Sequence, residues 1–211
     1  QMSFCNAIVV VDREVDPTDA PAVMGRLREV FDPASDLTLT QGVLDVLDHS
    51  SPTPNFGSKV GVDLTRRLPG EPPRRAPEAA AAPLTAAPER LGAFLRERVD
   101  GVVGARIDPP QGAAQGDALR QRILLVGVAK PGDRSGAAYA ERLLGLPELA
   151  AFRLIVLYDA ALDLADASLT LWKLFNNTDP ARDLHFRGGR CVVDACRKDA
   201  SDGHHREWPD E

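Results

Sequence analysis

The residues best suited to chemistry in this chain of 211 are Gly57, Ser58 and Lys59, which follow a loop rich in serine, proline and asparagine. Glycine gives the turn flexibility, and serine adds a hydroxyl group. The lysine behind them can be aimed as a point charge at a phosphate or a carboxylate. A strand is predicted over residues 60–62, so the lysine would stand at its start. From the residues alone, an anion-binding lysine and an ordinary exposed lysine are equally good interpretations.

A second basic loop, "GVAKPGDRSG" at residues 127–136, follows a predicted strand and precedes a predicted helix. A phosphate-binding loop would occupy such a position. The segment matches neither GxGxxG nor the P-loop pattern, because Pro131 follows Lys130. We therefore favour a plain connecting loop, and a Rossmann-like nucleotide binder is the weakest functional hypothesis.

The histidines form no recognisable catalytic set. No acid and nucleophile lie at useful spacing from His49, so a catalytic triad is not supported. His204 and His205 lie in a charged terminal segment, for which a solvated structure is expected.

Composition argues against several classes of function. The net charge of −6 disfavours nucleic acid or an anionic membrane as the main partner. No apolar run approaches the ~20 residues that span a bilayer, and no signal peptide is recognisable. Cys5, Cys191 and Cys196 do not form a disulfide or zinc framework in the sequence. We therefore expect each of them to be a small buried hydrophobic residue, in a protein of the reducing cytoplasm. Because the first residue is Gln1 rather than Met, we expect a piece of a longer protein.

An internal repeat organises the chain. The string "DPASDL" at residues 32–37 recurs as "DPARDL" at residues 179–184, an offset of 147 positions. The same offset aligns "IVVVDREVDPTDA" with "IVLYDAALDLADA" without a gap. Asp63 aligns with Asp194 once sixteen residues are dropped from the second copy. We interpret the pattern as a duplication of one folding unit.

Four acidic side chains in the first copy are close enough in sequence to suggest a metal site: Asp12, Glu14, Asp16 and Asp19. The second copy keeps the aspartates but has Ala161 in place of Glu14. We therefore favour an architectural role, since aspartate caps helices and forms turns.

Each copy is predicted to contain a strand, a helix and returning strands, which indicates a layered α/β fold with a mixed or mostly parallel sheet flanked by helices. Predicted strands include residues 8–11, 122–128 and 154–157. Predicted helices cover residues 21–31, 88–99 and 135–144, and a fourth runs from 169 to an end at 176–177. The first unit spans residues 1–70, a Pro/Ala-rich linker and a helix span 71–120, and the second, shortened unit lies within 121–211.

The segments "IVVVDREVDPTD", "FDPASDL" and "LDHSSPTPNFGSKVGVDLTRR" resemble the C-terminal domain of UbiD-type decarboxylases. The strings "LWKLFNNTDPARDL" and "DGHHREWPDE" resemble the same pattern again, as in the long members of the menaquinone-biosynthesis type. The resemblance covers residues 4–70 and 120–211. The chain departs from the family pattern at Val60, Leu64 and the Arg13–Glu14 pair.

This resemblance implies a non-oxidative decarboxylase of aromatic or α,β-unsaturated acids that uses prenylated FMN, with a divalent metal (Mn) and potassium near its phosphate. The family's catalytic Glu/Arg/Glu set and most flavin contacts lie in an upstream split-barrel domain. Lys59 aligns with the family lysine that reaches toward the flavin, and Gly57 and Ser58 shape its loop. The second copy lacks this loop and would pack against a partner in a homo-oligomer.

The leading hypothesis is thus the C-terminal region of a UbiD-type enzyme, possessing no catalysis of its own, that helps to close the active site and assemble the oligomer. The alternative is a stand-alone binding or assembly domain that has kept the fold and lost the chemistry.

Overall fold

The computed structural model describes residues 5–75, 88–108 and 123–208. Residues 76–87 and 109–120 of the linker and helix segment predicted over 71–120 lie outside these ranges. Among the described residues, no helix is long and apolar enough to cross a membrane.

The described residues form two mixed sheets instead of the single sheet predicted from the sequence. The small sheet has the order β1-β3-β2 and contains β1 (Ala7–Val10), β2 (Leu37–Val43) and β3 (Phe56–Asp63). The large sheet has the order β4-β5-β6-β8-β7 and contains β4 (Val102–Asp108), β5 (Ile123–Val128), β6 (Leu154–Asp159), β7 (Leu184–Arg187) and β8 (Arg190–Asp194). The α/β class is therefore confirmed, in two sheets.

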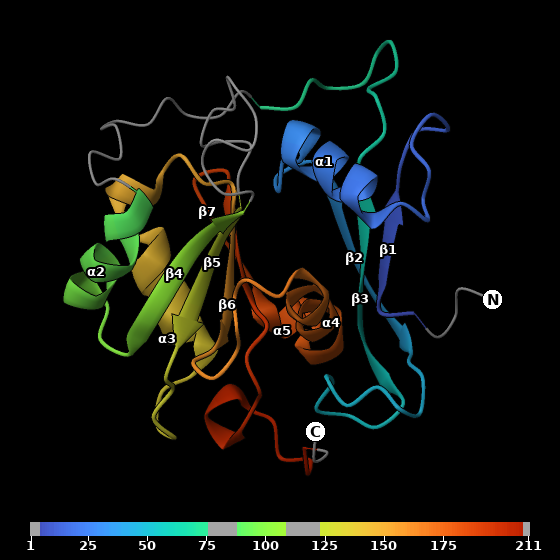
Figure 1. Cartoon of the computed structure of the whole chain (residues 1–211). Coiled ribbons are helices and arrows are strands. Elements are labelled where there is room, and N and C mark those ends of the chain that lie inside the picture. The colour runs from blue at the N-terminus through green and yellow to red at the C-terminus, as the bar shows by residue number, and fades with distance from the viewer. Residues whose placement is uncertain (1–4, 76–87, 109–122, 209–211) are drawn as a thin grey trace.

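Helices separate and cover the sheets (Figure 1). They are α1 (Ala20–Val30), α2 (Pro88–Arg98), α3 (Gly136–Leu144), α4 (Ala167–Asn177) and α5 (Pro180–Asp183), with 3-10 turns at Pro147–Leu149 and Ala200–Asp202. The helices α2 and α3 pack on one face of the large sheet. The helices α1 and α4 lie on its other face, between the two sheets.

Local signals place most helix ends where they were predicted. The carboxylate of Asp19 accepts a hydrogen bond from the Ala22 N–H at 3.1 Å and so caps α1. The helix α4 ends at Asn177, and α3 ends at Leu144 with Gly145 as its C-cap. The strand β4 was not predicted, because its sequence "VVGARID" alternates poorly and contains a glycine.

The two copies share one topology. In each, the first strand pairs in parallel with the last and the middle strand pairs antiparallel with the last. The register agrees as well: Ala7 is opposite Val60, and its counterpart Leu154 is opposite Cys191. The helices α1 and α4 begin and end at positions that differ by the same 147 residues. Descent from one duplicated unit stays an interpretation of this agreement.

The repeated DPxxD strings form the same turn in both copies. The Asp32 N–H donates to the carboxylate of Asp36 at 2.8 Å, and the Asp179 N–H donates to the carboxylate of Asp183 at 2.8 Å. In the second copy this turn forms the short helix α5. Each string therefore closes on itself through its two aspartates, which explains why both are kept.

The inner faces of both copies are buried against each other in one apolar cluster. It includes Phe31, Leu64, Ile123, Leu125, Leu154, Val156, Tyr158, Cys191, Val193 and Ala195. A three-stranded sheet with a single helix buries little apolar area alone, so each copy depends on the other for its stability. A second cluster fills the space between the large sheet and the helices α2 and α3.

A pair of leucine substitutions tests the shared cluster. Leu64 is fully buried there, whereas Leu68 is 67% exposed. We expect Leu64→Ala to lower the free energy of unfolding by about 2–5 kcal/mol, because it leaves a cavity between the copies. The control Leu68→Ala should change it by no more than about 0.5 kcal/mol. Urea denaturation of both variants gives the comparison, and equal losses would contradict the shared core.

Candidate functional site

The sequence-predicted residues Gly57, Ser58 and Lys59 all lie in β3, the central strand of the small sheet. Successive side chains of a strand point to opposite faces. Val62 packs in the apolar cluster between the sheets, and Ser58 is on the same face as Val62. Lys59 therefore lies on the opposite, outer face, where the described part of the chain places no helix (Figure 1). Its Nζ donates to the Cys5 carbonyl at 2.9 Å.

Gly57 is required by close packing of the preceding loop. A Cβ atom at this position would be 2.6 Å from Leu44 Cδ1 and 2.8 Å from Ser51 Cβ, which is closer than real carbon atoms approach. The Ser51 hydroxyl also donates to the Phe56 carbonyl at 2.7 Å. The loop thus lies directly against the start of β3 and fixes the strand that carries Lys59.

Ser58 joins the first copy to the second. Its side chain is buried, and its hydroxyl donates to the carboxylate of Asp179 in a very short hydrogen bond. The Ala181 N–H donates back to the same hydroxyl oxygen at 2.7 Å. These contacts take up both the donor and an acceptor position of the hydroxyl. Ser58 therefore anchors β3 to the start of α5, and its predicted role in cofactor binding stays a prediction.

The C-terminal tail forms hydrogen bonds and a ring contact with the loop that precedes β3. Arg206 Nη1 donates to the Ser51 carbonyl at 2.9 Å and to the Asp48 carbonyl at 3.3 Å. The ring of Trp208 meets the ring of His49 edge to face, with 4.7 Å between centroids. The segments "LDHSS" and "HHREW", whose bonded residues Ser51 and Arg206 are 155 positions apart, thus meet in space.

The burial of this tail corrects one expectation. His204 is 2% exposed and Trp208 is 5% exposed, so the solvated terminus predicted there is wrong for these two side chains. His205 is exposed, as expected. The burial of the tail could have been expected from Trp208, because so large an apolar side chain is rarely left in water.

The loop at residues 127–136 is structural. Lys130 Nζ forms an ion pair with Asp202 at 2.5 Å and also donates to the Arg197 carbonyl at 3.0 Å. The Gly136 N–H, at the start of α3, donates to the Asp202 carboxylate at 2.8 Å. A carboxylate of the chain itself therefore occupies the position that a bound phosphate would take, which supports the plain-loop interpretation.

A model of a known protein family matches most of the chain. The model of the 3-octaprenyl-4-hydroxybenzoate carboxy-lyase C-terminal domain (UbiD_C) matches residues 1–64 and 85–203. The chain belongs to the UbiD family.

Similar proteins are longer than this UbiD-family chain. Uncharacterized proteins of two Helicobacter pylori strains (ATCC 700392 / 26695 and J99 / ATCC 700824) are each 30% identical over 213 residues, covering 100% of this chain and 31% of theirs. An uncharacterized protein of Aeropyrum pernix is 40% identical over 72 residues, covering 34% of this chain and 15% of its own length. The chain thus spans about a third of the Helicobacter relatives.

Two solved structures of the UbiD-class enzyme HmfF from Pelotomaculum thermopropionicum are also similar. An evolved dimeric form in complex with prFMN has a TM-score of 0.41 and 13% identity, covering 78% of this chain and 40% of that chain. HmfF in complex with FMN has a TM-score of 0.41 and 12% identity, covering 82% of this chain and 42% of that chain.

The second copy of the UbiD-family chain contains a cluster of buried charged side chains. Lys198 Nζ lies 3.2 Å from Asp194 and 3.7 Å from Asp183, and all three side chains are buried. Burial alone would raise the pKa of Asp194, but Lys198 and Lys130 together lower it. Burial raises the pKa of Asp183 despite the same lysine.

The first copy repeats this arrangement with arginine in place of lysine. Arg67 forms an ion pair with the buried Asp36 and a longer one, of 3.4 Å, with Asp63. Arg74 Nε also binds Asp36, at 2.7 Å. Of the two carboxylates in the first copy only Asp36 is buried, because the Asp63 side chain is 43% exposed. These ion pairs hold the loops after the parallel strands in place.

The remaining candidate residues fall into structural roles. Asp12 and Glu14 form ion pairs with Arg66, and Asp16 accepts hydrogen bonds from Thr18. Within the described ranges, no group of three or more His, Cys, Asp or Glu residues could hold a metal ion.

The cysteines agree with expectation at two of three positions. Cys191 and Cys196 are buried, and burial raises the pKa of each thiol. Cys5 is exposed, so the expectation of burial was wrong there.

The Ser58 anchor leads to a test of coupling between the copies. Ser58→Ala would leave the Ala181 N–H and the Asp179 carboxylate without their shared partner, so we expect the free energy of unfolding to fall by about 1–3 kcal/mol. Ser135→Ala is the matched control, because Ser135 makes no capping hydrogen bond. Denaturant unfolding measures both, and a Ser58→Ala loss no larger than the control's would contradict the anchor.

The clamped tail predicts a pH dependence of stability. Burial, reinforced by the charges of Arg182 and Arg206, lowers the pKa of His204 to about 4. Below about pH 6.5 the unfolded chain binds a proton here that the folded chain refuses, so stability falls as pH falls from about 6.5 to about 4. We expect this group to account for about 2 kcal/mol of the loss between pH 7 and pH 4.5.

Denaturant unfolding at both pH values checks this assignment. His204→Gln should lose less stability between pH 7 and pH 4.5 than the parent chain, because it removes the titrating group. The control His205→Gln, at an exposed position, should lose as much as the parent. If His204→Gln shows the parent's full pH dependence, the buried histidine is not its source.

Proposed function

We propose that this chain is the C-terminal region of a prenylated-FMN-dependent decarboxylase acting on aromatic or α,β-unsaturated acids, with quinone biosynthesis as a candidate pathway. In this role it closes one side of the active site and contributes to oligomer assembly. Membership of the UbiD family supports the reaction class. The observation that carries the proposal is the position of Lys59, which is half-buried on the outer face of β3 within the family-specific segment.

A comparison of the two copies supports a binding role for the Lys59 face. In the second copy, the equivalent face of β6 and β8 is buried under α3: Ile155, Leu157 and Val192 all belong to that core. In the first copy, Val10 on this face is 49% exposed, and glycine stands at position 61. In the described part of the chain, the first copy has no helix on the face that the second copy covers with α3, and an upstream split-barrel domain is the partner we propose for this face.

The residues of this face fit a phosphate-bearing cofactor. Lys59 supplies a positive charge, and at Gly61 a Cβ atom would touch only Thr38, at 3.8 Å or more, so the backbone is open to close approach. Prenylated FMN, when bound, would supply the decarboxylation chemistry, and Lys59 would hold its phosphate. Gly57 and Ser58 would keep the strand in place. The proposed divalent metal and potassium belong to the upstream part.

The second copy offers a surface suited to assembly. Along α4, Leu169, Trp172 and Phe175 recur at a spacing of three residues and are 37%, 49% and 43% exposed. Large apolar side chains in a row are typical of protein contacts. This stripe supports the proposal that the second copy packs against another subunit.

The proposal is tested in a protein that joins this chain to its upstream split-barrel domain. Lys59→Ala should reduce bound flavin after purification, because a phosphate-facing cation is lost; a fall of roughly tenfold in affinity is expected for a charge-assisted contact. Flavin absorbance per protein gives the measurement. Lys173→Ala, a lysine substitution in the second copy, is the control and should retain the parent's occupancy. Equal flavin occupancy in Lys59→Ala and the parent would mean that Lys59 is a surface residue that does not hold the flavin.

A further inference from the structure

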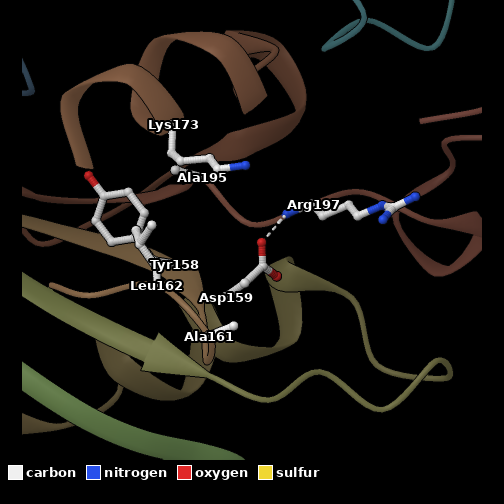
Figure 2. A pocket seen from close by; sticks show the side chains of 7 residues that line it. All are labelled: Tyr158, Asp159, Ala161, Leu162, Lys173, Ala195 and Arg197. Atoms are coloured by element: carbon white, nitrogen blue, oxygen red, sulfur yellow. Dashed lines mark hydrogen bonds between the residues drawn. The ribbon is translucent and has the colours of Figure 1, made fainter. Parts of the chain in front are cut away.

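Two cavities of different chemistry involve the second copy. One, of about 340 Å³, opens where β6 and β8 end (Figure 2). Its lining mixes apolar side chains with Asp159, Lys173 and Arg197, so it does not define one class of ligand. The other, of about 100 Å³, lies between the two copies and is lined by apolar side chains from both. We call it the inter-copy cavity.

Equivalent positions of the two copies line the inter-copy cavity. Leu27 of α1 and its counterpart Leu174 of α4 both belong to the lining. So do Leu37, which begins β2, and its counterpart Leu184, which begins β7. The cavity is therefore formed where the inner faces of the repeated unit meet each other.

The two copies differ in side-chain volume at two other positions of this lining. Phe31 is the C-cap of α1, and its counterpart Thr178 is the C-cap of α4. The first copy thus has an aromatic ring where the second has only a methyl and a hydroxyl group. Conversely, Ala7 begins β1, whereas its counterpart Leu154 begins β6. Each copy lacks a hydrocarbon group that the other has, and the two small residues, Ala7 and Thr178, both line the cavity.

The lining suits an uncharged occupant. Among the described residues that form it, none is acidic, basic or a histidine. A water molecule needs two to four polar partners, which such a lining does not offer. A buried charge without a partner would cost far more. In another protein, an apolar cavity of about 150 Å³ stays dry and binds benzene or xenon.

The inter-copy cavity reaches the molecular surface beside α4. Phe175 belongs to its lining and is 43% exposed. The Asn6 side chain, which also lines the cavity, donates through Nδ2 to the Phe175 carbonyl at 3.0 Å. A small molecule therefore has an entrance, and a ring larger than the enclosed volume can project through it.

We propose that the inter-copy cavity binds a small uncharged hydrocarbon molecule, no larger than about one aromatic ring, which takes the volume left beside Ala7 and Thr178. Because the molecule would contact both copies, its binding would stabilise their packing. The Lys59 face is not involved. The proposal holds whether or not the chain takes part in decarboxylation.

Benzene is the probe, and benzoate is its charged comparison. Both are titrated into the ¹⁵N-labelled 211-residue chain, and the amide shifts of β1, β3, β6 and β8 are followed by NMR. We expect saturable benzene binding with a Kd of about 1 mM or tighter, and at least roughly tenfold weaker binding of benzoate at these strands. No saturation by benzene, or equal affinity for the two, overturns the proposal.

Two variants fill the cavity with a side chain that the other copy already has at that position. Ala7→Leu and Thr178→Phe should each weaken benzene binding by at least roughly tenfold, because they occupy its volume. Ala7→Leu should also raise the melting temperature without ligand by roughly 2–4 °C, as cavity-filling substitutions do. Ala137→Leu, at an exposed position of α3, is the control and should leave benzene affinity within about twofold. If a folded Ala7→Leu or Thr178→Phe binds benzene like the parent, the cavity is not the site.

A side chain of a second copy of the chain is the other occupant to test, because Phe175 belongs to the apolar stripe of α4. Analytical ultracentrifugation should give the same mass for the parent and for Ala7→Leu. A folded Ala7→Leu of lower mass than the parent would mean that another subunit fills the cavity, which overturns the proposal.

Discussion

The structure depends on the mutual burial of two apolar sheet faces, with buried polar contacts between them. The apolar cluster supplies most of the driving force, because neither copy can remove its inner face from water alone. Apolar contact is not directional, however, and does not by itself define how two sheets align. The hydrogen bonds between Ser58, Asp179 and the Ala181 N–H are directional, and they fix β3 against the start of α5.

The two copies of the repeat differ in which of their surfaces are covered. Both copies keep the same strand order, register and aspartate turns, yet each is open where the other is filled. Among the residues that the structure describes, no helix covers the outer sheet face of the first copy around Lys59, and the strand ends of this copy are closed by Arg26 and Glu14. The second covers its outer face with α3 and leaves a cavity at its strand ends. A shared frame allows such differences, since the turns that maintain it do not take part in either opening.

The C-terminal tail adds a second connection between the copies. Arg206 bonds to the carbonyls of the loop before β3, and Trp208 packs against His49 from the same loop. The loop in turn lies so close to Gly57 that no side chain fits there. The strand that presents Lys59 is therefore held by α5 from one side and by the tail through the loop, which limits its motion at the proposed binding face.

The sequence by itself determined the local features, because their causes are local. Helical periodicity and the Asp19 cap placed α1, and the offset of 147 residues located the second copy. Only the tertiary structure decided features that depend on distant residues. Two sheets form instead of one because the copies face each other, and His204 is buried where its ring meets Trp208 and Arg182. Ser58 could be recognised as part of a motif, but its partner lies 121 residues away, and no spacing rule connects them.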